Sequence, residues 1–227
     1  MATLHVLRVF TAADGSHGNP LGVFLAGGEI APEARPEVAR DLGFAETVFV
    51  DDAEHGELRI FAPDMEMPFA GHPTVGAAWL LREEGVAVDS LRVAAGELAV
   101  RHEPDLTWVE ADPEWSPPFE YVELESSGQV DALAGPPDGL TIAYCWAWED
   151  EAAGRVRARS FVLDAGIPED EATGSAALTL GARLGRQIEV RQGRGSSLFA
   201  RPVGDGRAEV GGRVVVDEVR GYSVESR

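Results

Sequence analysis

Two short segments carry residue types that could hold a small anion. Residues 70–78 (Ala-Gly-His-Pro-Thr-Val-Gly-Ala-Ala) and residues 172–177 (Ala-Thr-Gly-Ser-Ala-Ala) each place glycine before a run of small side chains. Such a pattern predicts a helix start, where unpaired backbone N–H groups carry partial positive charge and glycine lets a ligand approach them. Two of these starts facing each other across a cleft would clamp a carboxylate or an enolate. Ordinary helix capping is the alternative.

The chain repeats itself around these two segments. Residues 59–68 and 159–168 share an arginine, a phenylalanine, an aspartate and a proline at one constant offset (159 − 59 = 100). Each copy then runs into a glycine turn and a small-residue helix. We interpret this as a duplicated unit of strand, turn and helix, with chance or convergence as the alternative. Small side chains on both helices indicate that sheet encloses each of them.

Hydrophobic periodicity and the breaker residues predict the remaining elements. Strands are expected at 4–10, 21–26, 46–51, 57–62, 140–148 and 155–163, and a hairpin or meander of strands at 89–112. Helices are expected at 32–43 and 74–84, closed by Gly43 and Gly85, and at 174–185. The stretch 112–140 is predicted to hold the crossover from one domain to the next and one short helix. Several short β runs separated by glycine are expected over 188–225.

Composition excludes several classes of function. The 227 residues include 39 acidic and 19 basic ones, and a net charge of -20 disfavours binding to nucleic acid or to anionic membranes. The chain has no lysine, which excludes Schiff-base chemistry through that side chain. Cys145 is the single cysteine, so a two-thiol racemase mechanism is excluded. We find no signal-peptide pattern and no apolar run of about 18 residues, and we expect a cytoplasmic protein.

Several segments, in order and spacing, resemble the PhzF-like family of phenazine-biosynthesis proteins. They are residues 45–50, 58–63, 68–78 and 166–177, with Gly-Asn-Pro at 18–20 and Gln-Gly at 192–193. The resemblance implies the diaminopimelate-epimerase-like α+β fold, in which two pseudo-symmetric lobes each wrap a mostly antiparallel sheet around a central helix. The N-terminal lobe is expected at 1–112, and the C-terminal strand of the chain could complete it. The C-terminal lobe is expected at 113–227, in shortened form.

The resemblance also implies what the site does. It implies an isomerase without metal or organic cofactor, acting between the lobes on a small carboxylate-bearing substrate, in a homodimer. Glu46 is expected to shuttle the proton as general acid and base, since a carboxyl in an apolar cleft has a raised pKa. His72 and Asp170 would assist as catalytic residues, and Gly71, Thr173, Gly174 and Ser175 would bind substrate.

Each of these residues also has a structural interpretation from the sequence alone. Glu46 could be a surface or capping glutamate, and His72 a core or capping histidine. Asp170 could bind a substrate amine or hydroxyl, orient His72, or simply satisfy the dipole of the following helix. Ser175 could be a helix-start hydroxyl. The enzyme hypothesis therefore requires that the Glu46 carboxyl lie close to both predicted helix starts.

Three departures from the family pattern concern the substrate. Residues 43–45 are Gly-Phe-Ala where the family usually has Asn-Leu-Ser, which removes a hydroxyl beside Glu46. Glu171 stands where the family usually has proline, and the chain is shorter than typical members. These changes favour a substrate other than the phenazine precursor, or weaker catalysis. Two other hypotheses stay open: a non-catalytic small-acid binding protein of the same fold, and a self-associating structural protein.

Overall fold

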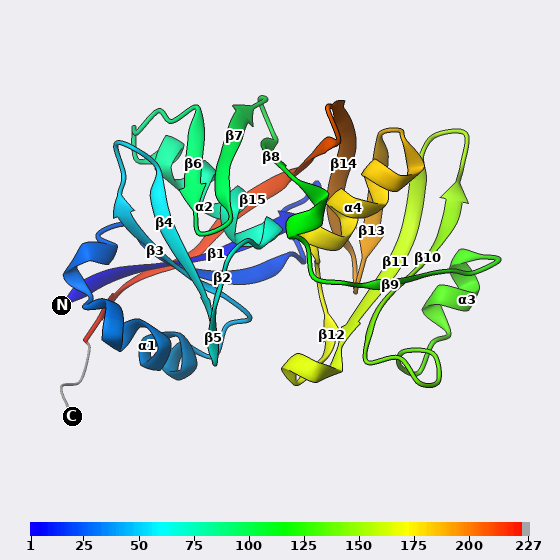
Figure 1. Ribbon diagram of the computed structural model, residues 1–227, viewed down its shortest axis with the longest axis horizontal. Helices are drawn as coiled ribbons and strands as arrows, with labels where there is room; N and C mark the ends of the chain where they lie inside the picture. The colour runs from blue at the N-terminus through cyan, green and yellow to red at the C-terminus, as the bar shows by residue number, and fades with distance from the viewer. Residues whose placement is uncertain (224–227) are drawn as a thin grey trace.

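Two lobes with the same strand pairing make up the molecule, and the computed structural model describes residues 1–223 of the chain (Figure 1). The first lobe contains β2 (Asn19–Phe24), β3 (Thr47–Asp52), β4 (Glu57–Ala62), β5 (Met65–Met67), β6 (Ser90–Val93), β7 (Gly96–His102) and β8 (Thr107–Ala111). The second contains β9 (Glu120–Glu123), β10 (Ile142–Asp150), β11 (Arg155–Val162), β12 (Ile167–Asp170), β13 (Ile188–Gln192) and β14 (Ser196–Gly204).

The pairing confirms the duplication that the sequence suggested. In the first lobe β4 pairs with β3 and β5 antiparallel and with β6 parallel. In the second lobe β11 pairs with β10 and β12 antiparallel and with β13 parallel. The corresponding strands β2 and β9 both run parallel to their neighbours β3 and β10. This is the α+β fold of two related lobes that the sequence predicted.

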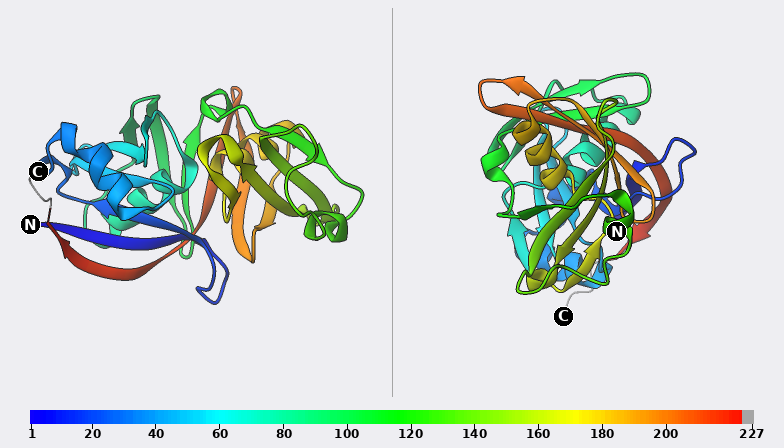
Figure 2. Two further views of the ribbon diagram at one scale, coloured as in Figure 1. Left: turned by 90° about the horizontal axis from the view of Figure 1, so that it is seen from below. Right: turned by 90° about the vertical axis from the view of Figure 1, so that its right-hand side faces the viewer.

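One long strand joins the lobes, and a second lies beside it. β1 (Ala2–Thr11) and β15 (Arg207–Tyr222) run side by side, as both views of Figure 2 show. β15 also pairs with β8 of the first lobe and β14 of the second, so its hydrogen bonds connect the sheets into one continuous path. The assignment of residues 1–112 and 113–227 to separate lobes stays a prediction.

One helix lies at the centre of each lobe. α2 (Gly71–Glu83) and α4 (Gly174–Leu184) are buried along most of their length. A Cβ on Gly76 of α2 would lie 2.5 Å from Leu21 Cδ2, and one on Gly181 of α4 would lie 3.0 Å from the Ala200 Cβ. The small residues are therefore required for the close approach of helix and sheet.

The shorter helices lie away from the two central helices. They are α1 (Arg35–Leu42), α3 (Ser127–Asp131) and the single 3₁₀ turns at Gly27–Glu29, Pro32–Ala34, Pro113–Trp115 and Leu163–Ala165. α1 ends at Gly43, whose φ of 67° is the left-handed conformation that favours glycine. Residues of α1 pack with Leu4, Phe24 and Phe49 in a core separate from the main one.

Two sequence expectations differ from the structure. α2 begins at Gly71 instead of residue 74, because Pro73 is compatible with the first turn of a helix, where its missing N–H has no partner to lose. β15 is one long strand instead of several short runs. Its Gly211 and Gly212 face the rings of Trp108 and Phe10, where a Cβ would lie only 2.4 Å away, so they admit bulky neighbours and do not break the strand. The last predicted positions, 224–225, lie outside the described residues.

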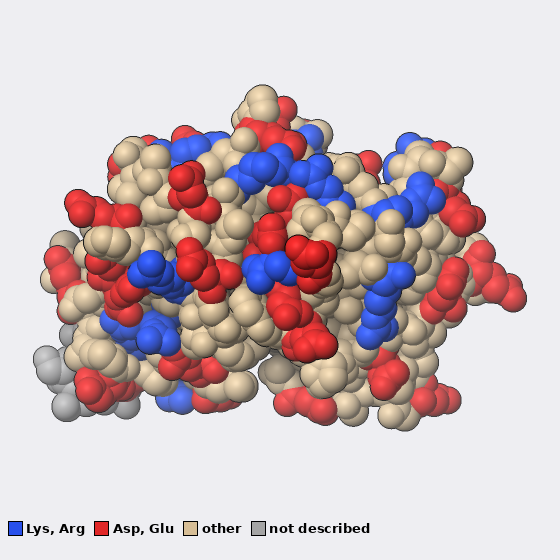
Figure 3. All heavy atoms as spheres, turned by 45° about the horizontal axis from the view of Figure 1, so that its top comes forward, with Lys and Arg blue, Asp and Glu red and all other residues tan. Residues whose placement is uncertain are grey.

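The surface is acidic with arginine between the acids. Figure 3 shows red carboxylate side chains over both lobes, interspersed with blue arginines. Asp217 of β15, for example, accepts a hydrogen bond from Arg8 at 2.7 Å. Within the described residues, the structure contains no helix that is both long and apolar enough to cross a membrane.

Candidate active site

The starts of the two central helices meet between the lobes. A Cβ placed on Gly71 would lie 2.7–2.8 Å from backbone atoms of Gly174 and Ser175, and one placed on Gly174 would lie 3.0 Å from Gly71 and the His72 nitrogen. Only glycine permits this contact, because the obstructing atoms are backbone. Neither N-cap residue, Ala70 or Thr173, accepts a side-chain capping hydrogen bond. The arrangement brings two sets of helix-start amides together.

Glu46 contacts His72 at the start of α2. Glu46 immediately precedes β3, and its Oε2 lies 3.4 Å from Nε2 of His72. The two side chains are 18% and 4% exposed, and neither of these atoms has a hydrogen-bond partner within the described chain. A pair of unsatisfied polar atoms in a buried position is costly in a purely structural site. It is expected where a ligand or a proton completes the bonding.

Burial keeps both groups neutral at neutral pH. Desolvation, followed by the negative charge of Asp170, raises the pKa of Glu46 from 4.5 to about 8. Desolvation lowers the pKa of His72 from 6.5 to about 3, although a hydrogen bond to the backbone of Pro20 opposes this shift. The short distance between Glu46 and His72 is therefore a contact between a carboxylic acid and a neutral imidazole, and not an ion pair.

The hydrogen bond to Pro20 assigns the tautomer of His72. Proline has no N–H, so its carbonyl must accept the bond from a ring nitrogen. Nε2 has no partner, so Nδ1 is the donor and carries the proton. Nε2 then presents a lone pair toward Glu46 and can accept the carboxyl proton or a hydrogen bond from it.

Asp170 ends β12 and is held by side chains from both lobes. Asn19 Nδ2 donates to its Oδ1 at 2.7 Å, and Thr173 Oγ1 donates to its Oδ2 at 2.6 Å. Burial raises the pKa of Asp170, while these two hydrogen bonds oppose the rise. Asn19 also donates to the Ala172 carbonyl at 3.1 Å. Asp170 is thus fixed in place just before α4 begins.

A further layer supports Thr173. Gln192 Nε2 donates to Thr173 Oγ1 and to the Asp170 carbonyl, both at 2.9 Å. The Tyr144 hydroxyl in turn donates to Gln192 Oε1 at 3.0 Å. The hydroxyl of Thr173 is therefore occupied by protein groups, so its predicted contact with substrate stays a prediction. In the described chain His72 bonds to Pro20 and not to Asp170, so Asp170 does not orient the imidazole in this arrangement.

Sequence reasoning named most of these residues but left three without a role. Asn19, Tyr144 and Gln192 all hydrogen-bond within the group around Asp170. The signals for Asn19 and Gln192 were present, because Gly-Asn-Pro at 18–20 and Gln-Gly at 192–193 belong to the family pattern. Nothing local marks Tyr144, since it lies in an apolar strand 48 residues from its partner.

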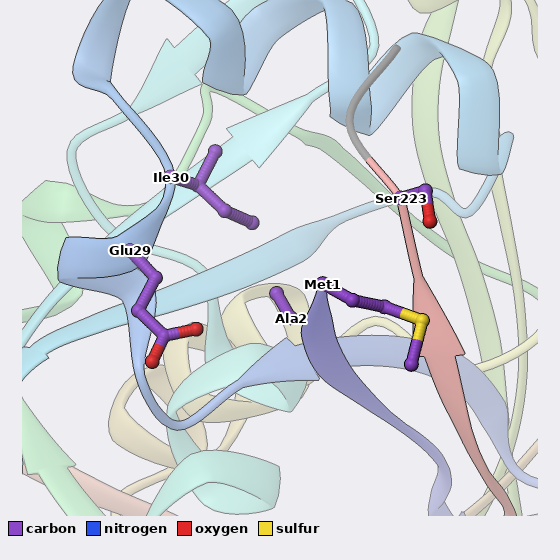
Figure 4. A pocket seen from close by; sticks show the side chains of 5 residues that line it. All are labelled: Met1, Ala2, Glu29, Ile30 and Ser223. Carbon is purple, nitrogen blue, oxygen red and sulfur yellow. The ribbon is translucent and has the colours of Figure 1, made fainter.

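A separate hollow lies beside the N-terminus of the chain. It has a volume of about 330 Å³ and is lined by Met1, Ala2, Glu29, Ile30 and Ser223 (Figure 4). Its lining includes one carboxylate and none of the predicted site residues. We therefore place the candidate active site at the paired helix starts and not in this hollow.

Comparison with known proteins gives consistent matches. The family model described as phenazine biosynthesis-like protein matches residues 7–136, more than half of the chain. An uncharacterised isomerase of Pasteurella multocida is 38% identical over 44% of this chain, although the matched part is only 36% of that protein. The trans-2,3-dihydro-3-hydroxyanthranilate isomerase of Pseudomonas fluorescens is 30% identical, with 88% of this chain and 89% of that one covered.

Solved structures show the same fold. A phenazine biosynthesis PhzC/PhzF protein from Clostridium difficile superimposes with a TM-score of 0.80 at 19% identity, over 98% of this chain and 100% of that one. A probable proline racemase from Agrobacterium radiobacter superimposes with a TM-score of 0.63 at 13% identity, over 99% and 94%. Taken with the family model and the related isomerases, these matches show that the chain belongs to the phenazine biosynthesis-like, or PhzF, family.

Proposed function

We propose that this chain is an isomerase that moves a proton on a small carboxylate-bearing substrate, with Glu46 as general acid and base. The observation that carries the proposal is the contact of the buried Glu46 carboxyl with His72, at the point where the starts of α2 and α4 meet. The family membership and the names of the related isomerases support the reaction class.

In the proposed reaction the Glu46 carboxylate takes a proton from one substrate carbon and, as the acid, returns it to another. A pKa of about 8 suits both half-reactions, because about one molecule in ten carries the carboxylate at pH 7 and the rest carry the acid. The negative charge that develops on the substrate is stabilised by the amides at Gly71–His72 and Gly174–Ser175.

The other residues have supporting roles in this proposal. His72 Nε2 lies 3.4 Å from Glu46 Oε2, where it can accept a hydrogen bond from protonated Glu46 during the reaction and so orient the acid toward the substrate. Asp170, presented by Asn19 and Thr173, binds an amine or hydroxyl of the substrate. A substrate with a carboxylate at the helix starts and an amine or hydroxyl at Asp170 would span both lobes.

The test is solvent-deuterium incorporation into trans-2,3-dihydro-3-hydroxyanthranilate, the substrate named by the relatives. Wild-type protein in D₂O is expected to label the product, and Glu46→Gln is expected to lose at least about 1,000-fold in rate while keeping its fold. Exposed Glu33→Gln is the matched control and should behave as the wild type. Full labelling by Glu46→Gln would remove Glu46 from the mechanism.

A non-catalytic small-acid binding protein is the second candidate. Ala45 favours it, because the family's serine hydroxyl is missing beside Glu46 and the Oε2 atom has no partner. This candidate predicts that a small acid retained by the purified protein, identified by native mass spectrometry, is recovered unchanged and unlabelled after incubation in D₂O. Turnover of the retained molecule would exclude it.

A further inference from the structure

Glu171, which stands where the family usually has proline, binds the turn between β13 and β14. Its Oε1 accepts a hydrogen bond from the Arg194 amide at 3.1 Å and from Ser196 Oγ at 2.9 Å. Gly193 makes room for this contact: its φ is +57°, and a Cβ there would lie 2.6 Å from Glu171 Oε2. The side chain is 15% exposed, so the added charge points into this turn.

Ser196 extends the contact to the other lobe. Its hydroxyl is fully buried and accepts a hydrogen bond from the Gly18 amide at 3.0 Å. The next residue, Asn19, donates its Nδ2 group to Asp170 and to the Ala172 carbonyl, the two residues that flank Glu171. The hydrogen bonds therefore form a closed ring, from Glu171 through Ser196 and Gly18–Asn19 back to the chain around Glu171.

We propose that Glu171 is a positioning residue, which holds Asn19 against Asp170 by fixing the hydroxyl of Ser196. This proposal rests on the proposed function, in which Asp170 binds the substrate. Because Ser196 donates its single proton to Glu171, its lone pairs are directed toward the Gly18 amide. Without that acceptor, the hydroxyl can turn and leave a buried amide without a partner, which is costly.

The charge of Glu171 is not the important property in this proposal. Its ion pair with Arg194 joins it to a side chain that is 85% exposed, and such pairs contribute little. Oε1 accepts from both the Arg194 amide and Ser196, while Oε2 accepts only from Arg194, through the same amide at 3.2 Å and through Nε at 3.3 Å. Glutamine at this position would retain that oxygen, whereas alanine would remove it.

The test compares Glu171→Ala with Glu171→Gln, and uses Glu169→Gln as the matched control. Glu169 lies two residues away, pairs with Arg159 and does not contact the ring. The first readout is hydrogen exchange of the Gly18 amide, which needs no substrate. We expect exchange to accelerate about tenfold or more in Glu171→Ala and by less than about threefold in Glu171→Gln and in the control.

The second readout is kinetic, with trans-2,3-dihydro-3-hydroxyanthranilate as the probe. Glu171→Ala should raise KM about tenfold with a smaller change in kcat, and Glu171→Gln should have the KM of the wild type. Adding Ser196→Ala to Glu171→Ala should raise KM no further. The proposal would be overturned by an equal rise in KM in the alanine and glutamine variants, or by additive effects of Glu171→Ala and Ser196→Ala on KM. An unchanged Gly18 exchange rate in Glu171→Ala would also overturn it. A uniform loss of protection across all core amides would also overturn it, because that result indicates global destabilisation.

The two proposals fail in different ways. Wild-type protein that turns over neither the probe nor a small acid retained on purification would count against the proposed function, and the exchange of the Gly18 amide would still decide whether Glu171 fixes this ring.

Discussion

The contact between the two helix starts can be tested by adding one methyl group. In Gly71→Ala the new Cβ would lie 2.7 Å from the carbonyl carbon of Gly174 and 2.8 Å from its Cα and from the Ser175 nitrogen. All three obstructing atoms belong to the backbone of α4, so no side-chain rotation relieves the overlap. Restoring ordinary van der Waals contact requires the helix starts to separate by about 0.7 Å.

The expected magnitude follows from this separation. Overpacking of a close-packed interior costs about 1–3 kcal/mol in free energy of unfolding. A displacement approaching 1 Å at a catalytic centre can lower the rate by about 100-fold. In Gly174→Ala the corresponding contacts are 3.0 Å, so that variant should lose less on both measures. The predicted order, from mildest to most severe, is wild type, Gly174→Ala and Gly71→Ala.

Urea denaturation measures the stability change, and deuterium incorporation in D₂O measures the rate. Gly28→Ala is the matched control, because a Cβ at Gly28 meets nothing within 4 Å and its φ is not in the left-handed region. A Gly71→Ala protein with the stability and labelling rate of the wild type would refute the inference that these glycines let the helix starts meet. A reversed order of the two variants would refute the distance argument.

Three further predictions concern the buried site and the core around it. The pKa of Glu46 is raised from 4.5 to about 8, so between these pH values the folded state holds a proton that the unfolded state has lost. The free energy of unfolding of wild type relative to Glu46→Gln should therefore fall by a few kcal/mol, on the order of 4, as pH rises from about 4.5 to 8. Over the same range kcat/KM should rise with a midpoint near pH 8. A pH-independent difference in urea titrations would contradict the burial of this carboxyl. The pKa of His72 is lowered to about 3, so wild type should lose stability relative to His72→Asn as pH falls from about 6.5 to 3, and parallel acid-unfolding curves would count against this. Leu81→Ala, in the fully buried face of α2, should cost about 2–5 kcal/mol in urea unfolding, and a cost below about 1 kcal/mol would mean that this face is not close-packed.

Much of the site's framework could be predicted from local sequence. Glycine before a run of small residues predicted both central helices, because helix starts and glycine preferences depend on a few neighbouring residues. The repeated segments predicted the duplicated strand–turn–helix unit, and the strand pairing of the two lobes confirms it. The family resemblance, carried by short segments in order, pointed to Glu46, His72 and Asp170 as the residues to examine.

Only the tertiary structure decided how these residues meet. Phe44 and Phe49 flank Glu46 in the sequence, yet Phe49 packs in a separate core with Phe24 and Phe61. Besides burial, the charge of Asp170, which lies far along the chain from Glu46, raises the pKa of the Glu46 carboxyl, and a pKa shift depends on such through-space neighbours.

The same reason applies to the second layer of the site. Glu171 stands close to where α4 begins, but its carboxylate is bound by a turn more than 20 residues further along the chain. Asn19 reaches Asp170 across 151 residues of sequence. Local propensity determines where helices and strands form, whereas the partners of a buried polar group are set by which strands and helices the fold packs together.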